Sequence, residues 1–151
     1  MRVLVQRVWS ARVVVDGETT GQIDHGLLVY VGIADGDDEA AVRWMAEKLA
    51  NLRIFNDDDG KLNRSVQDAR GGILLISNFT LLGDGGKGRR PSFVAAAPSE
   101  QAGRLHQKLA AALKAFGCAV AEGVFGADMT IDSQADGPVN IVLDRPASNG
   151  S

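Results

Sequence analysis

The chain has 151 residues, of which 45% are hydrophobic and 23% are charged, and its formal net charge is −3. This length and composition predict one domain with a buried core and exclude a chain that is disordered throughout. The slight acidic excess excludes nucleic-acid binding through overall charge, although it leaves room for a small basic site.

The first half of the chain predicts strands followed by one helix. Residues 3–8 and 13–15 are expected to form two strands joined near residues 10–11, with a turn at Asp16-Gly17. Residues 27–33 form a nearly continuous apolar run, which predicts a strand buried on both faces. Apolar residues then recur every three or four positions over residues 38–52, after aspartates that can cap a helix. Residues 53–63 predict a short hairpin.

The second half predicts a strand at residues 73–82 and a helix over residues 99–116, capped by Ser99 and ended by Gly117. Three further strands are expected at residues 120–125, 129–131 and 139–143. Together the elements predict an α/β fold in a single domain, residues 1–145, with two main helices packed on a sheet layer and further strands behind it. Residues 146–151 are expected to be a flexible tail.

The strand at residues 73–82 is unusual because Ser77, Asn78 and Thr80 interrupt its apolar run. The glycine-rich loop after it holds the densest positive cluster of the chain: Lys87, Arg89 and Arg90. This cluster either faces solvent without a specific partner or meets an anionic ligand.

Familiar catalytic motifs are incomplete. Gly83, Gly85 and Gly88 have the G-x-G-x-x-G spacing of a dinucleotide site, but Pro91 disfavours the helix that must follow. A Walker loop fails because Gly88 follows Lys87 where serine or threonine is required. No G-x-S-x-G elbow surrounds a serine, which argues against a Ser-His-Asp hydrolase. No zinc spacing and no complete calcium loop is present, so no metal is expected.

The cysteine count and the lengths of the apolar runs indicate the cellular compartment of the protein and whether it enters a membrane. The sole cysteine, Cys118, cannot form an internal disulfide, and an intracellular, reducing setting fits best. No apolar run approaches the roughly 20 residues of a membrane span, so no membrane association is expected.

One further candidate is made mainly of backbone. Asp136-Gly137-Pro138 precedes the last predicted strand. Glycine permits the close approach of a ligand, and an ordinary turn is the alternative.

The segments MRVLVQRV, GLLVYVGI, LRIFNDDDGKLN, ISNFTL, GRRPSF, GVFGADM and DGPVN, in this order, resemble the D-aminoacyl-tRNA deacylase family, once called D-tyrosyl-tRNA deacylase. The resemblance extends from Met1 to about Leu143. Two motifs are specific to the family. Its Ser-Gln-x-Thr signature is similar to Ser77-Asn78-Phe79-Thr80, and its Asn-x-Gly-Pro-Val-Thr signature is similar to residues 135–140.

The resemblance implies a three-layer α/β/β fold and a cytoplasmic homodimer without a metal or organic cofactor. The implied activity is hydrolysis of the ester between a D-amino acid, or glycine, and the terminal ribose of tRNA, with rejection of L-amino acids. Each active site would lie at the dimer interface. There, Gly137 and Pro138 of one subunit, joined by a cis peptide bond, would enter the partner's pocket and exclude L side chains with their carbonyls.

Catalysis is expected at four consecutive residues, Ser77, Asn78, Phe79 and Thr80. The backbone N–H groups around residues 78–80 are candidates to stabilise the developing negative charge on the carbonyl oxygen. The resemblance implies that the 2′-hydroxyl of the substrate ribose assists the reaction. A nucleophilic Thr80 ranks lower, because no adjacent base is visible.

Binding roles follow from the same resemblance. Substrate binding is expected from five residues: Gly137, Pro138, Arg7, Phe125 and Met129. Arg7 would hold the Gly-Pro loop, unless it is only a charge at a strand edge. Phe125 and Met129 would line the pocket, unless they only pack in the core. Lys87, Arg89 and Arg90 would meet phosphates of the tRNA acceptor end.

Three signature positions differ from the family pattern: Asn78 replaces glutamine, Ala135 replaces asparagine and Asn140 replaces threonine. The shorter side chain of Asn78 withdraws its amide by roughly 1.5 Å, one carbon–carbon bond. The alternatives are therefore a diverged paralogue with an altered substrate, a non-catalytic protein that binds tRNA ends, and a hydrolase of another small ester.

Overall fold

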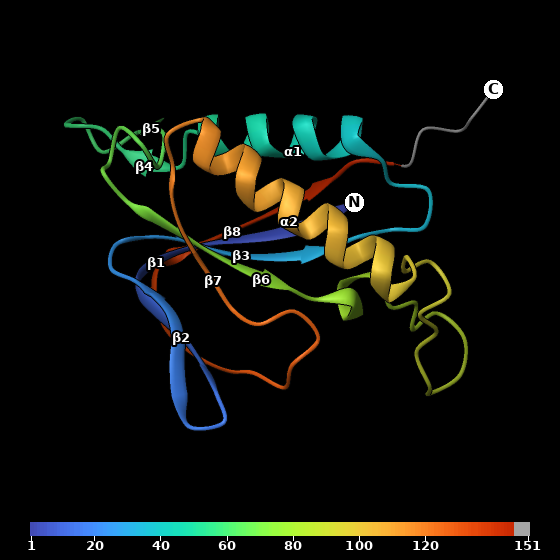
Figure 1. Ribbon diagram of the computed structural model, residues 1–151. Helices are drawn as coiled ribbons and strands as arrows, with labels where there is room; N and C mark the ends of the chain where they lie inside the picture. The colour runs from blue at the N-terminus through green and yellow to red at the C-terminus, as the bar shows by residue number, and fades with distance from the viewer. Residues whose placement is uncertain (147–151) are drawn as a thin grey trace.

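Two helices cover one face of a twisted sheet in the computed structural model, which describes residues 1–146 (Figure 1). The helices are α1 (Glu39–Asn51) and α2 (Ser99–Ala115). The sheet runs in the order β2 (Glu18–Ile23), β1 (Arg2–Val15), β3 (Gly26–Gly32), β6 (Gly72–Ser77) and β7 (Ala119–Glu122), and β8 (Thr130–Asp144) also pairs with β1. A separate hairpin consists of β4 (Phe55–Asn56) and β5 (Leu62–Arg64).

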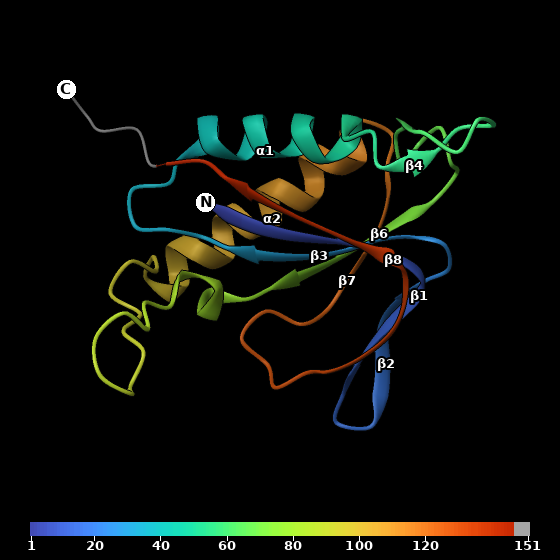
Figure 2. The same ribbon diagram turned by 180° about the vertical axis from the view of Figure 1, so that it is seen from behind.

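The long strand β1 connects two halves of the sheet. Its first half pairs with β3 and its second half with β2, both antiparallel, while β8 pairs with it through both halves. The neighbouring pairs β3–β6 and β6–β7 are parallel. The sheet bends where β1 passes from β3 to β2, so that β2 descends away from the helices (Figure 2).

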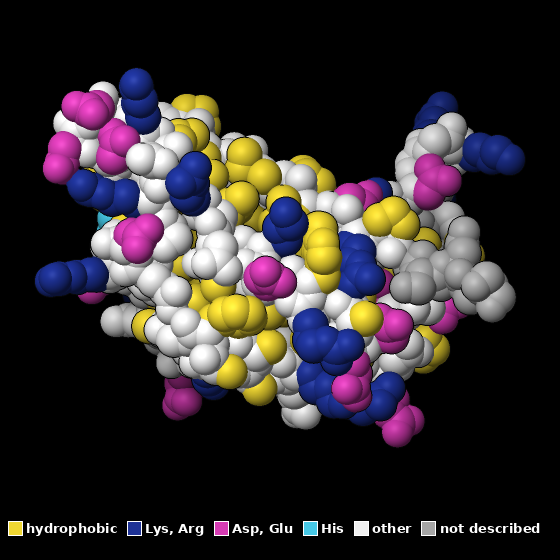
Figure 3. All heavy atoms as spheres, turned by 90° about the horizontal axis from the view of Figure 1, so that it is seen from above, with side chains coloured by type: hydrophobic (Ala, Val, Ile, Leu, Met, Phe, Trp, Pro, Cys, Tyr) yellow, Lys and Arg dark blue, Asp and Glu magenta, His cyan; other side chains and the backbone are white. Residues whose placement is uncertain are grey.

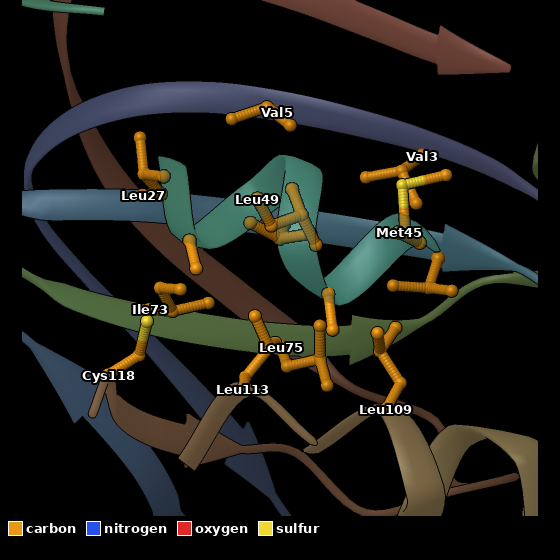
Figure 4. Packing of buried hydrophobic residues seen from close by; sticks show 14 of the residues in the cluster. Val3, Val5, Leu27, Met45, Leu49, Ile73, Leu75, Leu109, Leu113 and Cys118 are labelled. Atoms are coloured by element: carbon orange, nitrogen blue, oxygen red, sulfur yellow. The ribbon is translucent and has the colours of Figure 1, made fainter. Parts of the chain in front are cut away.

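Buried side chains lie on both faces of this sheet. On the helix side, Met45 and Leu49 of α1 pack with Leu109 of α2 against strand residues that include Ile73 and Leu75 (Figure 4). A second cluster on the opposite face contains Val8, Ala11, Val13, Leu28, Leu74 and Ile76. Alternate residues of β6 therefore enter opposite cores, because side chains alternate along a strand. The layers behind the helices are the two halves of one bent sheet, and the predicted α/β class is confirmed.

Several local predictions are confirmed. Strand β3 is buried on both faces, and the predicted hairpin at residues 53–63 is β4–β5. Helix α1 begins where expected, because the side chain of Asp38 accepts a hydrogen bond from the N–H of Ala41 at 2.9 Å. Gly117, at φ 93°, ends α2 in a conformation that favours glycine.

Other predictions were wrong. Residues 3–15 form one strand. Residues 130–131 and 139–143 belong to one strand, β8, and Met129 precedes it, because the pairing of β1 with β8 resumes beyond each irregularity. Strand β2 was missed, since its sequence ETTGQI is largely polar and exposed. Ser99 is the first helical residue rather than the cap, a position that Pro98 occupies without a capping side chain.

The strand predicted at residues 73–82 ends at Ser77 and is followed by a short 3₁₀ helix, η1 (Phe79–Leu82). No helix in the described part of the chain is long and apolar enough to cross a membrane. Residues 147–151 of the predicted tail lie outside the described residues, and the domain boundary at residue 145 stays a prediction.

Candidate active site

A cavity of about 670 Å³ lies where the parallel strands β3 and β6 end. The ends of parallel strands in α/β sheets are common ligand sites. The cavity is bounded by the end of β3, the β6–η1 junction, the start of α2 and the segment 125–129. It brings together six of the predicted site residues: Ser77, Asn78, Phe79, Thr80, Phe125 and Met129.

The β6–η1 junction exposes backbone donors. The N–H of Asn78 donates to the carbonyl of Val31 at 2.7 Å and is therefore occupied. The next two N–H groups, of Phe79 and Thr80, are the first of η1 and have no partner within that helix. The chain then turns, since the N–H of Leu81 donates to the Asn78 carbonyl at 3.3 Å. Phe79 and Thr80 thus remain as the candidate donors to an oxyanion.

The side chains at this junction are also paired. The hydroxyl of Thr80 donates a hydrogen bond to Oδ1 of Asn78. The Phe79 ring is exposed and makes an edge-to-face contact with Phe93, with ring centroids 5.2 Å apart. Asn78 therefore orients the Thr80 hydroxyl.

The opposite wall rests on α2. A Cβ added at Gly103 would lie 3.4 Å from the Phe125 ring, so the helix approaches this ring closely. The ring of His106 lies 6.0 Å from that of Phe125. His106 is only 6% exposed, and burial lowers its pKa below the ordinary value, while Glu122 has a smaller effect in the opposite direction. Burial therefore favours the uncharged form of the imidazole that lies behind Phe125.

Tyr30 also lines the cavity, and partial burial raises the pKa of its phenol. The hydroxyl thus stays protonated at neutral pH. Sequence reasoning missed this residue, along with the small residues Ala96, Ala97, Ser99 and Ala102. Nothing in the sequence indicated it, because Tyr30 stands at the centre of the strand predicted at residues 27–33.

Gly137 and Pro138 lie elsewhere, in β8, and do not line this cavity. Their peptide bond is cis. A Cβ at Gly137 would lie 2.3 Å from the backbone nitrogen of Val139, so only glycine fits there. Arg7, 7% exposed, donates to the carbonyls of Asp136 at 3.3 Å and Ile54 at 2.8 Å. Arg7 therefore contacts the residue that immediately precedes the Gly-Pro pair.

The basic loop forms a projecting tip. Asp84 and Ser92 pair through two backbone hydrogen bonds of 2.8 and 2.9 Å, which close the base of the loop. All three basic residues of the tip are exposed: Lys87, Arg89 and Arg90. By contrast, the helix-covered face shows acidic and basic side chains interspersed (Figure 3).

Comparisons with known proteins match the same family over nearly the whole chain. A family model described as D-Tyr-tRNA(Tyr) deacylase matches residues 4–144. The D-aminoacyl-tRNA deacylase of Deinococcus radiodurans is 54% identical over 144 residues, covering 95% of this chain and 99% of that one. That of Pelobacter propionicus is 50% identical over 145 residues, covering 96% and 100%.

Solved structures share the fold. One described as c-Myc DNA Unwinding Element Binding Protein superposes with a TM-score of 0.91 at 38% identity, covering 97% of this chain and 100% of that one. A probable eukaryotic D-amino acid tRNA deacylase has a TM-score of 0.82 at 17% identity, covering 95% and 98%, and this likeness shows the fold alone. With family sequence and family fold in agreement, the chain belongs to the D-Tyr-tRNA(Tyr) deacylase family.

Proposed function

We propose that the protein hydrolyses the ester bond of D-aminoacyl-tRNA, and of glycyl-tRNA, in the cavity at the ends of β3 and β6. The observation that carries the proposal is the pair of backbone N–H groups, of Phe79 and Thr80, at the β6–η1 junction that lines this cavity. Relatives named D-aminoacyl-tRNA deacylase support the substrate class.

The reaction needs an attacking oxygen and stabilisation of the carbonyl oxygen. Water adds to the ester carbon, the carbonyl oxygen becomes negative, and the N–H groups of Phe79 and Thr80 donate to it. The carbon–oxygen bond to the ribose then breaks, the ribose oxygen takes a proton, and free amino acid and tRNA leave. The neighbouring 2′-hydroxyl of the substrate assists proton transfer, so this route requires no metal or organic cofactor.

Thr80 is not the nucleophile in this scheme. Its hydroxyl proton is donated to the amide oxygen of Asn78, which is too weak a base to activate it. Asn78 in turn contributes no backbone donor, because its N–H is bonded to Val31. In this scheme Thr80 contributes its backbone N–H, and the side chains of Asn78 and Thr80 contribute only to the shape of the cavity wall.

The substrate side chain lies between the apolar walls of the cavity. Phe125 and Met129 contact it, and the small residues Ala96, Ala97 and Ala102 leave room for it. Because these contacts are apolar, they favour larger amino acids only modestly.

A second copy of the chain completes the site. Gly137 and Pro138 are joined by a cis peptide bond and lie outside the cavity of their own chain, in an irregular part of β8. In a homodimer the pair enters the partner's cavity, where its carbonyls collide with an L side chain but leave space for hydrogen or a D side chain. Glycine is therefore accepted.

The acceptor end of tRNA meets the basic tip. Lys87, Arg89 and Arg90 are exposed on the loop whose base contacts Phe79 through Phe93. Phosphate contacts of this kind release counterions, so affinity falls as salt increases. An aminoacyl-tRNA substrate also favours a cytoplasmic location.

A deacylation panel tests the function. Release of amino acid from matched D-aminoacyl-, L-aminoacyl- and glycyl-tRNA is measured with the purified chain, whose oligomeric state is determined in parallel. Rapid release from the D and glycyl esters, with slow release from the L ester, is expected. A folded dimer that hydrolyses none of them overturns the proposal, and tight tRNA binding without hydrolysis would establish a binding protein instead.

A further inference from the structure

The pairing of β1 with β8 is interrupted twice within a few residues. Gln6 pairs with Asn140 and Val8 with Ala135, so residues 136–139 of β8 lie opposite the single residue Arg7. Val8 pairs with Ala135 and Ser10 with Gln134, which leaves Trp9 as an extra residue of β1. Bulges of this kind redirect side chains and release backbone from the ladder.

His25 lies between the two bulges. It occupies the turn that joins β2 to β3, and its ring stacks on Trp9 with centroids 4.7 Å apart. The His25 ring also makes an edge-to-face contact with the Phe55 ring, with ring centroids 5.2 Å apart. Its Nε2 lies 2.9 Å from Oδ2 of Asp136, at the start of the other bulge.

The backbone of His25 is itself fixed by the sheet. Its carbonyl accepts a hydrogen bond from the N–H of Gly72, the first residue of β6, at 3.2 Å. The next residue, Gly26, packs so closely on Gly72 that an added Cβ would lie 2.0 Å from the Gly72 carbonyl oxygen. The backbone of His25 is thus held against the start of β6, one residue before β3 begins.

Two side chains share the Asp136 carboxylate, which is 13% exposed. Arg7 approaches it through Nε at 3.2 Å and Nη2 at 3.4 Å, but also bonds the Ile54 carbonyl and Asn56. His25 makes the shortest contact, and its other ring neighbours, Trp9 and Phe55, are uncharged. A hydrogen bond to a carboxylate is among the stronger ones in proteins.

We propose that His25 is a positioning residue that holds Asp136, and through it the Gly137-Pro138 pair, at the place required to discriminate D from L substrates. Residues 136–139 are released from the ladder, so side-chain bonds at Asp136 set where the pair projects. The proposal rests on the proposed function of that pair as an excluder of L side chains. It adds a residue from the β2–β3 turn that touches neither the cavity nor the Gly-Pro pair.

Three variants test the proposal: His25→Ala, His25→Gln and, as a control, Asp24→Ala in the same turn. The ratio of D- to L-aminoacyl-tRNA hydrolysis is expected to fall about tenfold in His25→Ala, the size expected for loss of one charge-assisted hydrogen bond. His25→Gln keeps an N–H near the position of Nε2 and should restore most of the ratio. Asp24→Ala should keep it.

Hydrogen exchange of the backbone over residues 134–142 provides a readout that needs no activity. Faster exchange in His25→Ala than in His25→Gln, with unchanged exchange in the helices, is expected. If exchange and the D-to-L ratio both stay at wild-type values in a folded His25→Ala variant, His25 does not position the pair. A chain inactive toward every ester refutes the proposed function, while exchange still decides whether His25 holds the loop.

Discussion

Strands β6 and β8 both carry proposed site residues, yet they are built in opposite ways. In β6, residues 73–76 are buried between two apolar clusters, and the site begins only where the strand ends. β8 is largely exposed and carries the Gly-Pro pair in its middle, inside an irregularity of the pairing. The contrast shows two ways to place functional backbone: at the end of a rigid strand, or in a bulge held by side chains.

The largest expected effect is on stability and separates the two strands. Leu75→Ala in β6 removes a fully buried side chain beneath the helices and should lower the free energy of unfolding by about 2–5 kcal/mol. Val142→Ala in β8, at a side chain 62% exposed, should change it by less than about 0.5 kcal/mol. Urea unfolding of both variants measures the difference, and similar losses would contradict it.

The second effect concerns activity. Gly137→Ala places a methyl group 2.3 Å from the Val139 nitrogen, so the pair must move by about an ångström. A displacement of this size should lower the rate of deacylation, or the ratio of D- to L-ester hydrolysis, about a hundredfold. Gly85→Ala is the matched control, because no atom lies within 4 Å of the added Cβ. Deacylation of D and L esters measures both, and a normal D-to-L ratio in Gly137→Ala would argue against a role in chirality.

The third effect is a pH dependence on the helix side of the sheet. Burial lowers the pKa of His106 in the folded state, so the unfolded state binds the proton more readily. The stability that His106 contributes in its neutral form is present above about pH 6.5, the ordinary pKa of histidine, and is lost as pH falls further. His106→Phe should flatten this decline in unfolding experiments, whereas Gln107→Ala, at the exposed neighbouring position, should leave it unchanged.

The smallest effect is expected at the end of β6. Asn78→Gln introduces the glutamine of the signature that residues 77–80 resemble, but the Asn78 N–H is bonded to Val31 and its side chain contacts Thr80. Changing such a side chain should alter kcat/KM for D-aminoacyl-tRNA by less than about threefold, which is under 1 kcal/mol. A large gain in rate would instead identify this chain as an enzyme weakened at position 78.

The sequence was informative where burial decides the structure. The apolar run of β3 and the three- and four-residue spacing in α1 predicted both elements, because each buries a continuous apolar face. Strand β2 and the middle of β8 escaped prediction, because their residues are largely exposed and polar, and pairing with β1 rather than burial makes them strands. A proline within β8 also resembled a turn.

The candidate site likewise has residues that the sequence predicted and contacts that it could not predict. Ser77 to Thr80, Phe125 and Met129 were named from family motifs, and they line one cavity. The occupied N–H of Asn78 and the contact of His25 with Asp136 could not be derived, because both depend on how strands distant in sequence come together. Nothing in the sequence around His25 indicates a contact with a carboxylate 111 positions away.

The bulge in β8 also has a consequence for protein engineering. The ladder stops at the Val8–Ala135 pair and resumes at Gln6–Asn140, so the register of each half is set independently of what lies between. A segment with this property can be exchanged or lengthened without redesigning the sheet on either side. Residues 136–139 are thus a natural place to graft other recognition loops onto this scaffold.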